Sequence, residues 1–244
     1  MVNGFRFQHG LARTSLAIAA LTGFGLLAAS TASAADNKVT IKQVESTNGL
    51  AISNQQGSAN TANFSQTGNT HVARLSQSGT KNAFELTQSA SANSFVVNEK
   101  GDSNKVSGMQ SGAGNAADIS IDGKANSVSS NQTGDRNSLK VTQKGSNHSV
   151  ANTQTGKGES ATISQSDSSN YAFNYQYGAG SVYKLTQTGT SNSAQNIQGG
   201  SNNTATVTQS GSMNNAITNQ YGSRDQATIS QSGSSNMAMV TQSD

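Results

Sequence analysis

The sequence predicts an all-β protein, a β-solenoid with cross-β character. In it, stacked 22-residue strand–turn–strand repeats form two parallel sheets that face a thin core. Three observations lead to this prediction. Glutamine recurs at every eleventh position over most of the chain, inward and outward residue types alternate before each glutamine, and glycine stands two residues after most of the glutamines. Alternation with a period of two is typical of strands, and glycine suits sharp bends of the backbone.

Composition excludes an ordinary enzyme with a large aliphatic core. Of the 244 residues, 32% are hydrophobic and 11% are charged, and the chain contains no Pro, Cys or Trp. Flexible linkers and disordered tails favour Pro or a high net charge, so a disordered chain is also disfavoured. The absence of Cys excludes disulfides and thiolate metal sites. The 15 basic residues are not clustered as a nucleic-acid-binding surface would require.

The first 34 residues have a different character and are predicted to be a secretory signal peptide. Arg6 and Arg13 precede an apolar run from Leu16 to Ala29, and small residues precede the expected cleavage site after Ala34. A basic start, a short apolar stretch and a small-residue cleavage site are typical of such leaders. A membrane anchor is the alternative, but the run is short for a span of about 20 residues.

The repeat determines the expected domain organisation. Residues 35–48 form an N-terminal segment with one leading strand at 39–43, and residues 49–244 form nine repeats of 22 residues. Each repeat contains two strands of five or six residues joined by glycine-containing tight turns. The eleven-residue grid runs without insertion, and only Glu99 and Ile121 interrupt it. The glutamines on the grid are Gln55, Gln66, Gln77, Gln88, Gln110, Gln132, Gln143, Gln154, Gln165, Gln176, Gln187, Gln198, Gln209, Gln220, Gln231 and Gln242.

Residues six, four and two positions before each glutamine share a strand face with it, and this face is predicted to point inward. In the second strand of each repeat the position six before glutamine carries Asn, except at His148. These asparagines are Asn60, Asn82, Asn104, Asn126, Asn170, Asn192, Asn214 and Asn236. A buried amide without a partner costs about 1–3 kcal/mol. Rungs stacked about 4.8 Å apart avoid this cost, because each amide donates to one neighbour and accepts from the other. Both sets are therefore predicted to form self-assembly ladders.

No catalytic, cofactor-binding or metal site is predicted, because a repeat supplies the same groups everywhere whereas catalysis needs unlike groups that converge. His71 and His148 are expected to replace a ladder Asn near a corner. Four aspartates are predicted to act as gatekeepers that slow premature stacking. These candidates are Asp102, Asp122, Asp135 and Asp167.

The pattern Ser/Asn-x5-Gln-x-Gly-x2-Asn-x-Ala-x3-Gln resembles that of the curlins, the subunits of bacterial curli amyloid fibres. Clear matches run from Asn203 to Gln220 and from Ser181 to Gln198, and the resemblance covers residues 49–244. It implies secretion across both membranes of a Gram-negative cell and assembly into surface fibres of the biofilm matrix, for adhesion and aggregation. The implied partners are further copies of the chain, a nucleator curlin, and an outer-membrane curli secretion pore with its accessory proteins. No nucleic acid, small-molecule substrate or cofactor is implied.

Two alternatives remain beside a major-type fibre subunit. The first is a curli nucleator, but nucleators tend to carry a divergent basic final repeat, whereas residues 226–244 are regular and contain no Lys or Arg. The second is a monomeric β-solenoid that binds ice or another surface. Its outward column would need uniform Thr, but Arg74, Asp118, Lys140 and Lys184 interrupt that column. We also expect both solenoid edges to be open, because no capping element follows the last strand.

Overall fold

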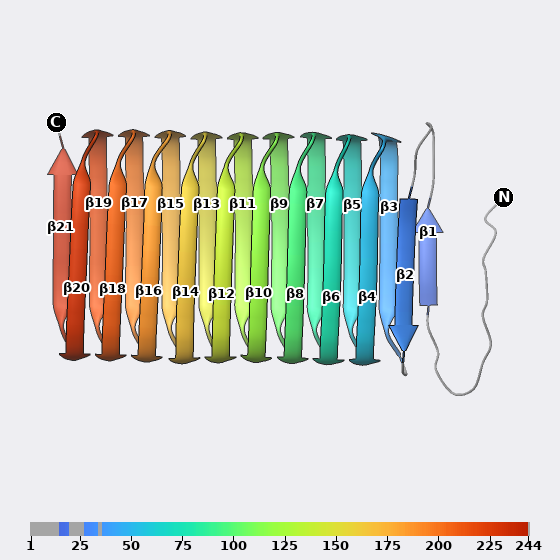
Figure 1. The fold of residues 1–244 in the computed structure, drawn as a ribbon, viewed down its shortest axis with the longest axis horizontal. Helices are drawn as coiled ribbons and strands as arrows, with labels where there is room; N and C mark the ends of the chain where they lie inside the picture. The colour runs from blue at the N-terminus through green and yellow to red at the C-terminus, as the bar shows by residue number, and fades with distance from the viewer. Residues whose placement is uncertain (1–14, 20–26, 34–35, 244) are drawn as a thin grey trace.

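The computed structural model describes residues 15–19, 27–33 and 36–243, and every regular element within these ranges is a β-strand. Successive strands wind into a flattened coil, with odd-numbered strands in one sheet and even-numbered strands in the other (Figure 1). The odd sheet contains β1 (Ser15–Ala19), β3 (Lys38–Thr47), β5 (Thr61–Asn69), β7 (Ala83–Ser91), β9 (Lys105–Ala113), β11 (Ser127–Asp135), β13 (Ser149–Lys157), β15 (Tyr171–Ala179), β17 (Ser193–Ser201), β19 (Asn215–Ser223) and β21 (Met237–Ser243). The even sheet contains β2 (Leu27–Ser33), β4 (Leu50–Ser58), β6 (Val72–Thr80), β8 (Ser94–Asp102), β10 (Ala116–Lys124), β12 (Ser138–Ser146), β14 (Ser160–Ser168), β16 (Val182–Thr190), β18 (Thr204–Ser212) and β20 (Gln226–Ser234).

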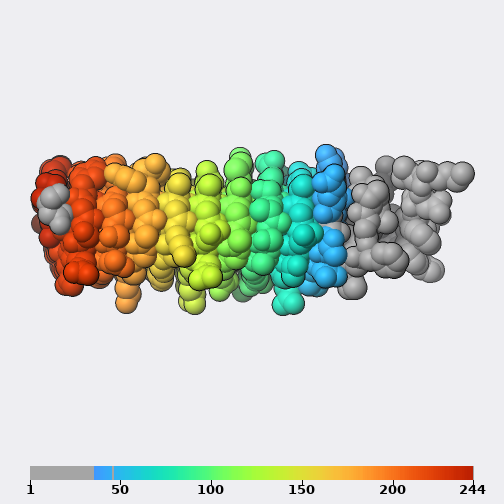
Figure 2. Space-filling model, turned by 90° about the horizontal axis from the view of Figure 1, so that it is seen from above, coloured from blue at the N-terminus to red at the C-terminus, as the bar shows by residue number. Residues whose placement is uncertain are grey.

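This architecture confirms the predicted β-solenoid of two parallel sheets. Each strand pairs in parallel with the strand two places further along the chain, and equivalent residues of successive repeats lie side by side. Gln132 of β11, for example, is the register partner of Gln154 of β13. We call one even strand and the odd strand that follows it a rung. Figure 2 shows the rungs succeeding one another along the axis of an elongated rod.

The strands are longer than expected because the sheets continue around the corners. Nine residues, rather than five or six, form each strand from β4 to β20. The corner glycine therefore lies inside the strand, as at Gly123, where φ is +149°. A second residue with positive φ follows two positions later, and its N–H bonds the preceding rung: Ala125 donates to the carbonyl of Asp102 at 2.9 Å. In-register stacking thus satisfies the backbone at the bend as well as along the straight segments.

Glycine is required at the corner because the next rung lies directly against it. A Cβ atom on Gly123 would lie 1.8 Å from the carbonyl oxygen of Gly145. Two corners of the repeat region carry other residues, Ala90 and Asp167, and their φ values of +73° and +75° are smaller than those of the corner glycines. The corner backbone therefore adopts a different conformation where a side chain is present.

The core lies between the two sheets and is packed by alternating large and small residues. Along the even sheet, Phe95 stands between Ala73 and Ala117, and further along the column Tyr183 stands between Ala161 and Ala205. A small neighbour on each side gives a ring room that a rung spacing of about 4.8 Å alone does not provide. Across the core, Phe95 reaches Gly108 of the odd sheet, where an added Cβ would lie 2.4 Å from the ring.

At the N-terminal end, β3 spans the segment in which a leading strand was expected. Val39 and Ile41 of β3 are buried, and the strand pairs with β5. The register shifts between Val44 and Thr47, which accommodates the one-residue difference in phase from the grid. The predicted signal peptide lies outside the described residues except for β1 and β2, which pair with β3 and β4. The described ranges contain no helix that could cross a membrane.

Two glycine-to-alanine substitutions test the corner. Gly123→Ala should lower the free energy of unfolding by about 3 kcal/mol or more, because it adds strain at positive φ to a clash with backbone. Gly158→Ala should cost about 1 kcal/mol, because nothing lies within 4 Å of its added Cβ and alanine already occupies the equivalent turn position at Ala59, Ala92 and Ala125. Denaturant unfolding followed by circular dichroism measures both changes. Equal losses would contradict this account of the corner.

Candidate functional site

The glutamines on the grid form hydrogen-bonded columns inside the two sheets, and the column of the even sheet is interrupted at Glu99 and Ile121. Along these columns a glutamine Nε2 donates to the Oε1 of the glutamine one rung further on, at 2.7–3.1 Å. Gln77 donates to Glu99 instead, and Oε1 of Gln143, which follows Ile121, has no partner. The columns therefore have a direction, with donors pointing toward the C-terminal rung and acceptors toward the N-terminal rung.

The second N–H of each glutamine amide links the two sheets. Gln132 Nε2 donates to the backbone carbonyl of Ala116, at the start of the preceding strand in the opposite sheet, at 2.9 Å. The same bond recurs along the chain, for instance from Gln154 to the Ser138 carbonyl. Gln132 is fully buried, yet both of its donors and its acceptor have partners. The amide desolvation cost is thus offset within the fold.

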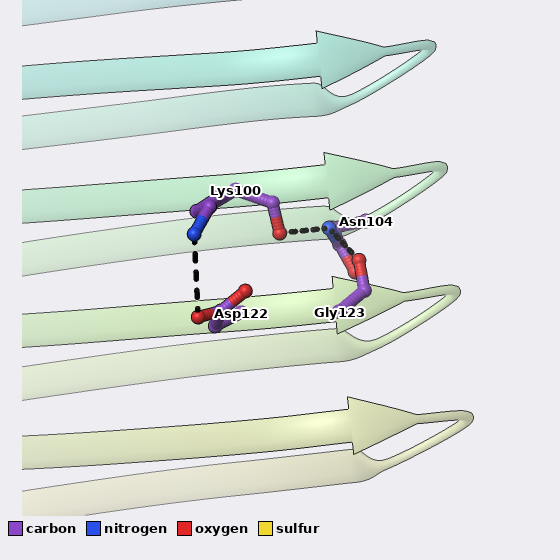
Figure 3. A network of polar contacts seen from close by, with 4 residues as sticks. All are labelled: Lys100, Asn104, Asp122 and Gly123. Carbon is purple, nitrogen blue, oxygen red and sulfur yellow. Dashed lines mark hydrogen bonds and ion pairs between the residues drawn. The ribbon is translucent and has the colours of Figure 1, made fainter.

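The asparagines six positions before glutamine bond mainly to backbone, which differs from the amide-to-amide contacts expected from the sequence. Asn104 Oδ1 accepts the backbone N–H of Asn126 at 3.0 Å. Its Nδ2 donates to the carbonyls of Lys100 at 3.4 Å and Gly123 at 2.9 Å (Figure 3). The side chain is short and stands where the backbone turns, so it reaches corner carbonyls more readily than the next amide. Direct amide contacts among the described asparagines of this column join Asn60 to Asn82, Asn192 to Asn214, and Asn214 to Asn236.

Two further polar columns were missed by the sequence analysis. The first occupies the same offset in the other half of the repeat, and its asparagines hold the opposite corners in the same way. Its members are Asn93, Asn115, Asn137 and Asn203. The second is an amide ladder inside the odd sheet, where Asn174 donates to Asn152 at 2.7 Å and Asn196 donates to Asn174 at 2.8 Å. Applying the offset count to both halves of the repeat would have found the first column.

The two buried histidines take the place of corner asparagines. His148 Nε2 lies 3.0 Å from the Lys144 carbonyl, and its Nδ1 accepts the backbone N–H of Asn170 at 3.3 Å. A carbonyl can only accept, so Nε2 carries the proton and the ring is neutral. His71 makes the equivalent contact with the Thr67 carbonyl at 3.0 Å. Burial lowers the pKa of both imidazoles.

The two corners that lack glycine both follow a histidine. An asparagine at position 148 or 71 would donate to the corner nineteen residues further on, which is Asp167 or Ala90. A neutral imidazole has one N–H, and in both histidines it faces a carbonyl of the same rung. His148 also interacts with the backbone and the carboxylate of Asp167.

Two buried carboxyl groups also stand in the amide columns. Glu99 occupies a glutamine position, and its Oε2 accepts from Gln77 Nε2 at 2.7 Å. Burial raises the pKa of Glu99 to about 8. Glu159 occupies an asparagine position, and its Oε2 accepts the backbone N–H of Ser181 at 2.9 Å. Burial raises the pKa of Glu159 to about 7. The second oxygen, Oε1, of each carboxyl is buried without a hydrogen-bond partner.

The gatekeeper candidates lie on the outer surface and at corners, and they are not equivalent. Asp122 lies 3.8 Å from Lys100 of the preceding rung (Figure 3). It is in register with Lys144 of the next rung. In the same way, Asp102 is in register with Lys124, and Asp135 with Lys157. Hydrogen bonds from the side chain and backbone of Thr80 lower the pKa of Asp102. Asp167, by contrast, lies at a corner between Gly145 and Gly189.

The described residues contain no group of three or more His, Asp or Glu side chains that could hold a metal ion. A rod of near-identical rungs, with polar columns that bond one rung to the next, is the architecture of a structural repeat protein. The geometry therefore defines the class as a structural β-solenoid.

Comparison with known families agrees with this class. The family model described as the Curlin associated repeat matches residues 57–89, 134–166 and 211–243. Each match begins at a corner glycine, Gly57, Gly134 or Gly211. Curlin associated repeats therefore recur across the chain, which supports a protein of the curlin type. Among curated protein sequences, none matches the chain.

Replacing one glutamine in the middle of a column tests its energetic weight. Gln132→Leu keeps the volume but leaves the Gln110 amide without its acceptor and the Gln154 carbonyl without its donor. We expect stability to fall by about 1–3 kcal/mol for each orphaned group. Thr133→Ala, at the exposed neighbouring position, should change stability by no more than about 0.5 kcal/mol. Chemical denaturation compares the two variants, and similar losses would argue against the column.

Proposed function

We propose that the chain is a secreted structural subunit that polymerises end to end into extracellular curli-type fibres of the biofilm matrix, where they serve adhesion and aggregation. The observation that carries the proposal is the directional glutamine column. Each rung offers donors on one side and acceptors on the other, and every rung has nearly the same shape. The bonds that join rungs within one chain can therefore join the last rung of one copy to the first rung of another.

The two ends of the described solenoid have complementary polar groups. In the structure the sheets end at β20 and β21, where Gln231 and Gln242 hold the last donors of the columns. Near the other end, Gln43 Oε1 and Gln55 Oε1 are buried acceptors without a partner. Donors at one end and acceptors at the other support addition in a single head-to-tail orientation. The grid glutamines and corner asparagines are thus proposed to act as the self-assembly ladder.

The edge strand also has apolar surface to bury. Met237 and Met239 of β21 are 75% and 62% exposed. Ala238 is only partly buried, whereas its register partner in the preceding odd strand, Ala216, is fully buried. An incoming strand would remove this apolar surface from water and pair the free backbone groups of β21. Burial and hydrogen bonding both favour the addition of another rung.

The curlin associated repeats support the remaining parts of the proposal. Residues 1–34 would direct export, and a curli secretion pore with its accessory proteins would carry the chain across the outer membrane. A nucleator curlin would start the fibre. The regularity of β20 and β21, and the absence of Lys and Arg from residues 226–244, favour a major-type subunit over a nucleator.

Fibre formation is the direct test. The purified chain at neutral pH should polymerise after a lag into unbranched fibres, visible by electron microscopy, that give reflections near 4.8 Å and about 10 Å. The first spacing arises because each rung adds one strand to each sheet. A chain that stays folded and monomeric for days at high concentration would contradict the proposal and favour a monomeric surface-binding solenoid.

The gatekeeper role is tested most cleanly at Asp167, because its neighbours in the column are glycines. Asp167→Gly should shorten the lag, since it removes an exposed charge from a stacking surface. Ala90→Gly is the matched control, because it makes the same corner change beside the other histidine without removing a charge. Thioflavin fluorescence follows both time courses. A lag that shortens equally in both variants would assign the effect to the corner backbone instead of the charge.

Asp102, Asp122 and Asp135 provide a second comparison. Each faces a lysine in an adjacent rung, so replacement by Asn removes an attraction as well as a charge. We expect these three variants to shorten the lag less than Asp167→Gly does.

A further inference from the structure

Four fully buried ionisable side chains stand in the amide columns, and each of them fits the column only in its uncharged form. They are His71, Glu99, His148 and Glu159. Asp225, near the C-terminal end of the asparagine column, is only partly buried. An amide has an oxygen that accepts and a nitrogen that donates. A neutral imidazole offers the same pair of functions, and so does a protonated carboxyl group. An imidazolium has no acceptor, and a carboxylate has no donor, so either ion breaks the column at its own rung.

At Glu99 the two oxygens divide these roles. Oε2 takes the place of the amide oxygen by accepting from Gln77, while Oε1 stands in the place of the amide nitrogen and has no donor. The grid glutamines donate from this position to a carbonyl sixteen residues earlier, as Gln110 does to Ser94 at 2.9 Å. The equivalent carbonyl for Glu99 is that of Ala83. A proton on Oε1 would give this carbonyl a donor, whereas ionisation would leave two acceptors facing each other.

The next residue of the same column explains why glutamic acid can stand there. An amide nitrogen has two hydrogens, whereas a protonated carboxyl has one. The hydrogen that the carboxyl lacks is the one that a glutamine would donate to the following rung. That rung carries Ile121, which needs no donor, and the column resumes at Gln143, whose Oε1 has no partner. Ile121 thus removes the need for the hydrogen that Glu99 lacks, and one acceptor, Gln143 Oε1, stays unpaired.

Glu159 repeats the arrangement in an asparagine column. Oε2 accepts the N–H of Ser181, as an asparagine Oδ1 would, and Oε1 is buried without a partner. Asparagines at this offset donate to the carbonyls four residues earlier and nineteen residues later, as Asn137 does to Thr133 and Gly156. The corresponding carbonyls for Glu159 belong to Thr155 and Gly178. A proton on Oε1 again supplies the donor that the corner requires.

Among the described residues, no charged group lies beside either carboxyl to stabilise its ion. Glu99 stands between Gln77 and Ile121, and across the core the inward residues of β7 and β9 are uncharged. The nearby Lys100 and Asp122 point outward and pair with each other. Glu159 stands between Asn137 and Ser181, with Gln154 and Gln176 at the ends of the facing strands.

The histidines are in similar surroundings. His71 stands between Gly49 and Asn93, with Gln66 and Gln88 at the ends of the facing strands, β5 and β7. His148 stands between Asn126 and Asn170, with Gln143 and Gln165 at the ends of β12 and β14. The one charged group that acts on His148 is Asp167 at the next corner. Its carboxylate favours the imidazolium but does not outweigh burial.

We propose that the fully buried positions of the amide columns admit only uncharged side chains, so that the solenoid forms when Glu99 and Glu159 hold a proton and His71 and His148 are neutral. The chain then carries a pH gate with two sides, and where assembly follows the proposed function, the same gate controls it. The alkaline side is set by the carboxyl groups and the acid side by the imidazoles.

The pKa shifts determine how stability changes with pH on the alkaline and acid sides of the gate. The glutamate pKa values are raised from 4.5 to about 8 and about 7, so the folded chain keeps protons that the unfolded chain has lost. Their contribution to stability is therefore complete below pH 4.5 and is lost as the pH rises through 7 to 8. The histidine pKa values are lowered from 6.5, so their contribution is complete above pH 6.5 and declines as the pH falls below it. Between pH 4.5 and 6.5 the glutamate and histidine contributions change with pH in opposite directions and offset each other, so stability should be greatest in this range and fall on either side of it.

Direct observation of the protons tests the proposal. The full chain has four glutamates, of which Glu45 and Glu85 are exposed and serve as internal references. With carboxyl-¹³C-labelled Glu, we expect nuclear magnetic resonance at pH 6 to show two protonated and two ionised carboxyl groups. The protonated signals should disappear in Glu99→Gln and Glu159→Gln, one in each variant. Four ionised carboxyl groups in the folded chain at pH 6 would overturn the proposal.

The effect on stability is measured by denaturant unfolding between pH 5 and 9. Between pH 6 and 8.5 the folding equilibrium constant of the unmodified chain should fall at least tenfold more than that of the Glu99→Gln, Glu159→Gln double variant. Glu85→Gln is the matched control and should follow the unmodified chain. On the acid side, the stability of His71→Asn with His148→Asn should keep rising as the pH falls from 6.5 to 5, whereas that of the unmodified chain levels off. An alkaline decline that persists in the double glutamate variant would overturn the assignment.

A second variant covers the case in which the double variant fails to fold. Glu99→Gln with Ile121→Gln restores an uninterrupted glutamine column and should remove the Glu99 part of the alkaline decline. These measurements need a folded chain and not a fibre. Fibres with pH-independent folding would contradict the gate alone, whereas pH-gated folding without fibres would contradict the proposed function alone.

Discussion

Parallel strands in register stack about 4.8 Å apart, and every polar group in the core must find its partner within that spacing. The thin core holds a glutamine in almost every strand and asparagine at most corners, so unpaired amides would cost far more than the marginal stability of a folded chain. The buried amides find their partners because the same rung is repeated along the axis of the rod. Because equivalent residues lie one above another, each glutamine donates to its own equivalent in the next rung. The chain can therefore bury a whole column of amides, although a single amide buried alone would have no partners.

The stacking of equivalent residues also determines the structure of the corners. The backbone turns so tightly that Gly123 leaves no room for a Cβ beside Gly145, and the asparagine of the preceding rung donates to the carbonyl exposed at that bend. Where histidine replaces asparagine, the next corner is Ala90 or Asp167 instead of glycine. Residues 19 positions apart are thus coupled through one hydrogen bond. A substitution in one rung is accompanied by a substitution in the next, because the side chains of each rung contact the backbone of its neighbour.

Interruptions of the columns show what the constraint tolerates. Glu99 and Ile121 stand in neighbouring rungs, and together they remove a donor and an acceptor from the same column. The carboxyl and imidazole groups in the columns reproduce an amide when they are neutral, and burial shifts their pKa values toward that neutral form. Charges are instead placed on the outer faces, where Asp122 lies between Lys100 and Lys144 in successive rungs. The polar groups inside the rod are thus neutral and paired donor to acceptor, whereas the charged groups lie on its surface.

The sequence by itself determined the class of fold, the period of the repeat, the inward strand face and the membership of the glutamine column. Each of these follows from counting along the chain, because an eleven-residue grid with period-two alternation allows one face and one register. Strand length and corner bonding were decided by the tertiary structure. Asn104 pairs with the backbone of Gly123, nineteen residues away, and that carbonyl is within reach because the next rung bends there. The protonation of Glu99 was likewise invisible in the sequence, since its pKa is set by burial between Gln77 and Ile121. Local pattern specifies which residues face inward, but only the stacked neighbour determines which atoms each of them meets.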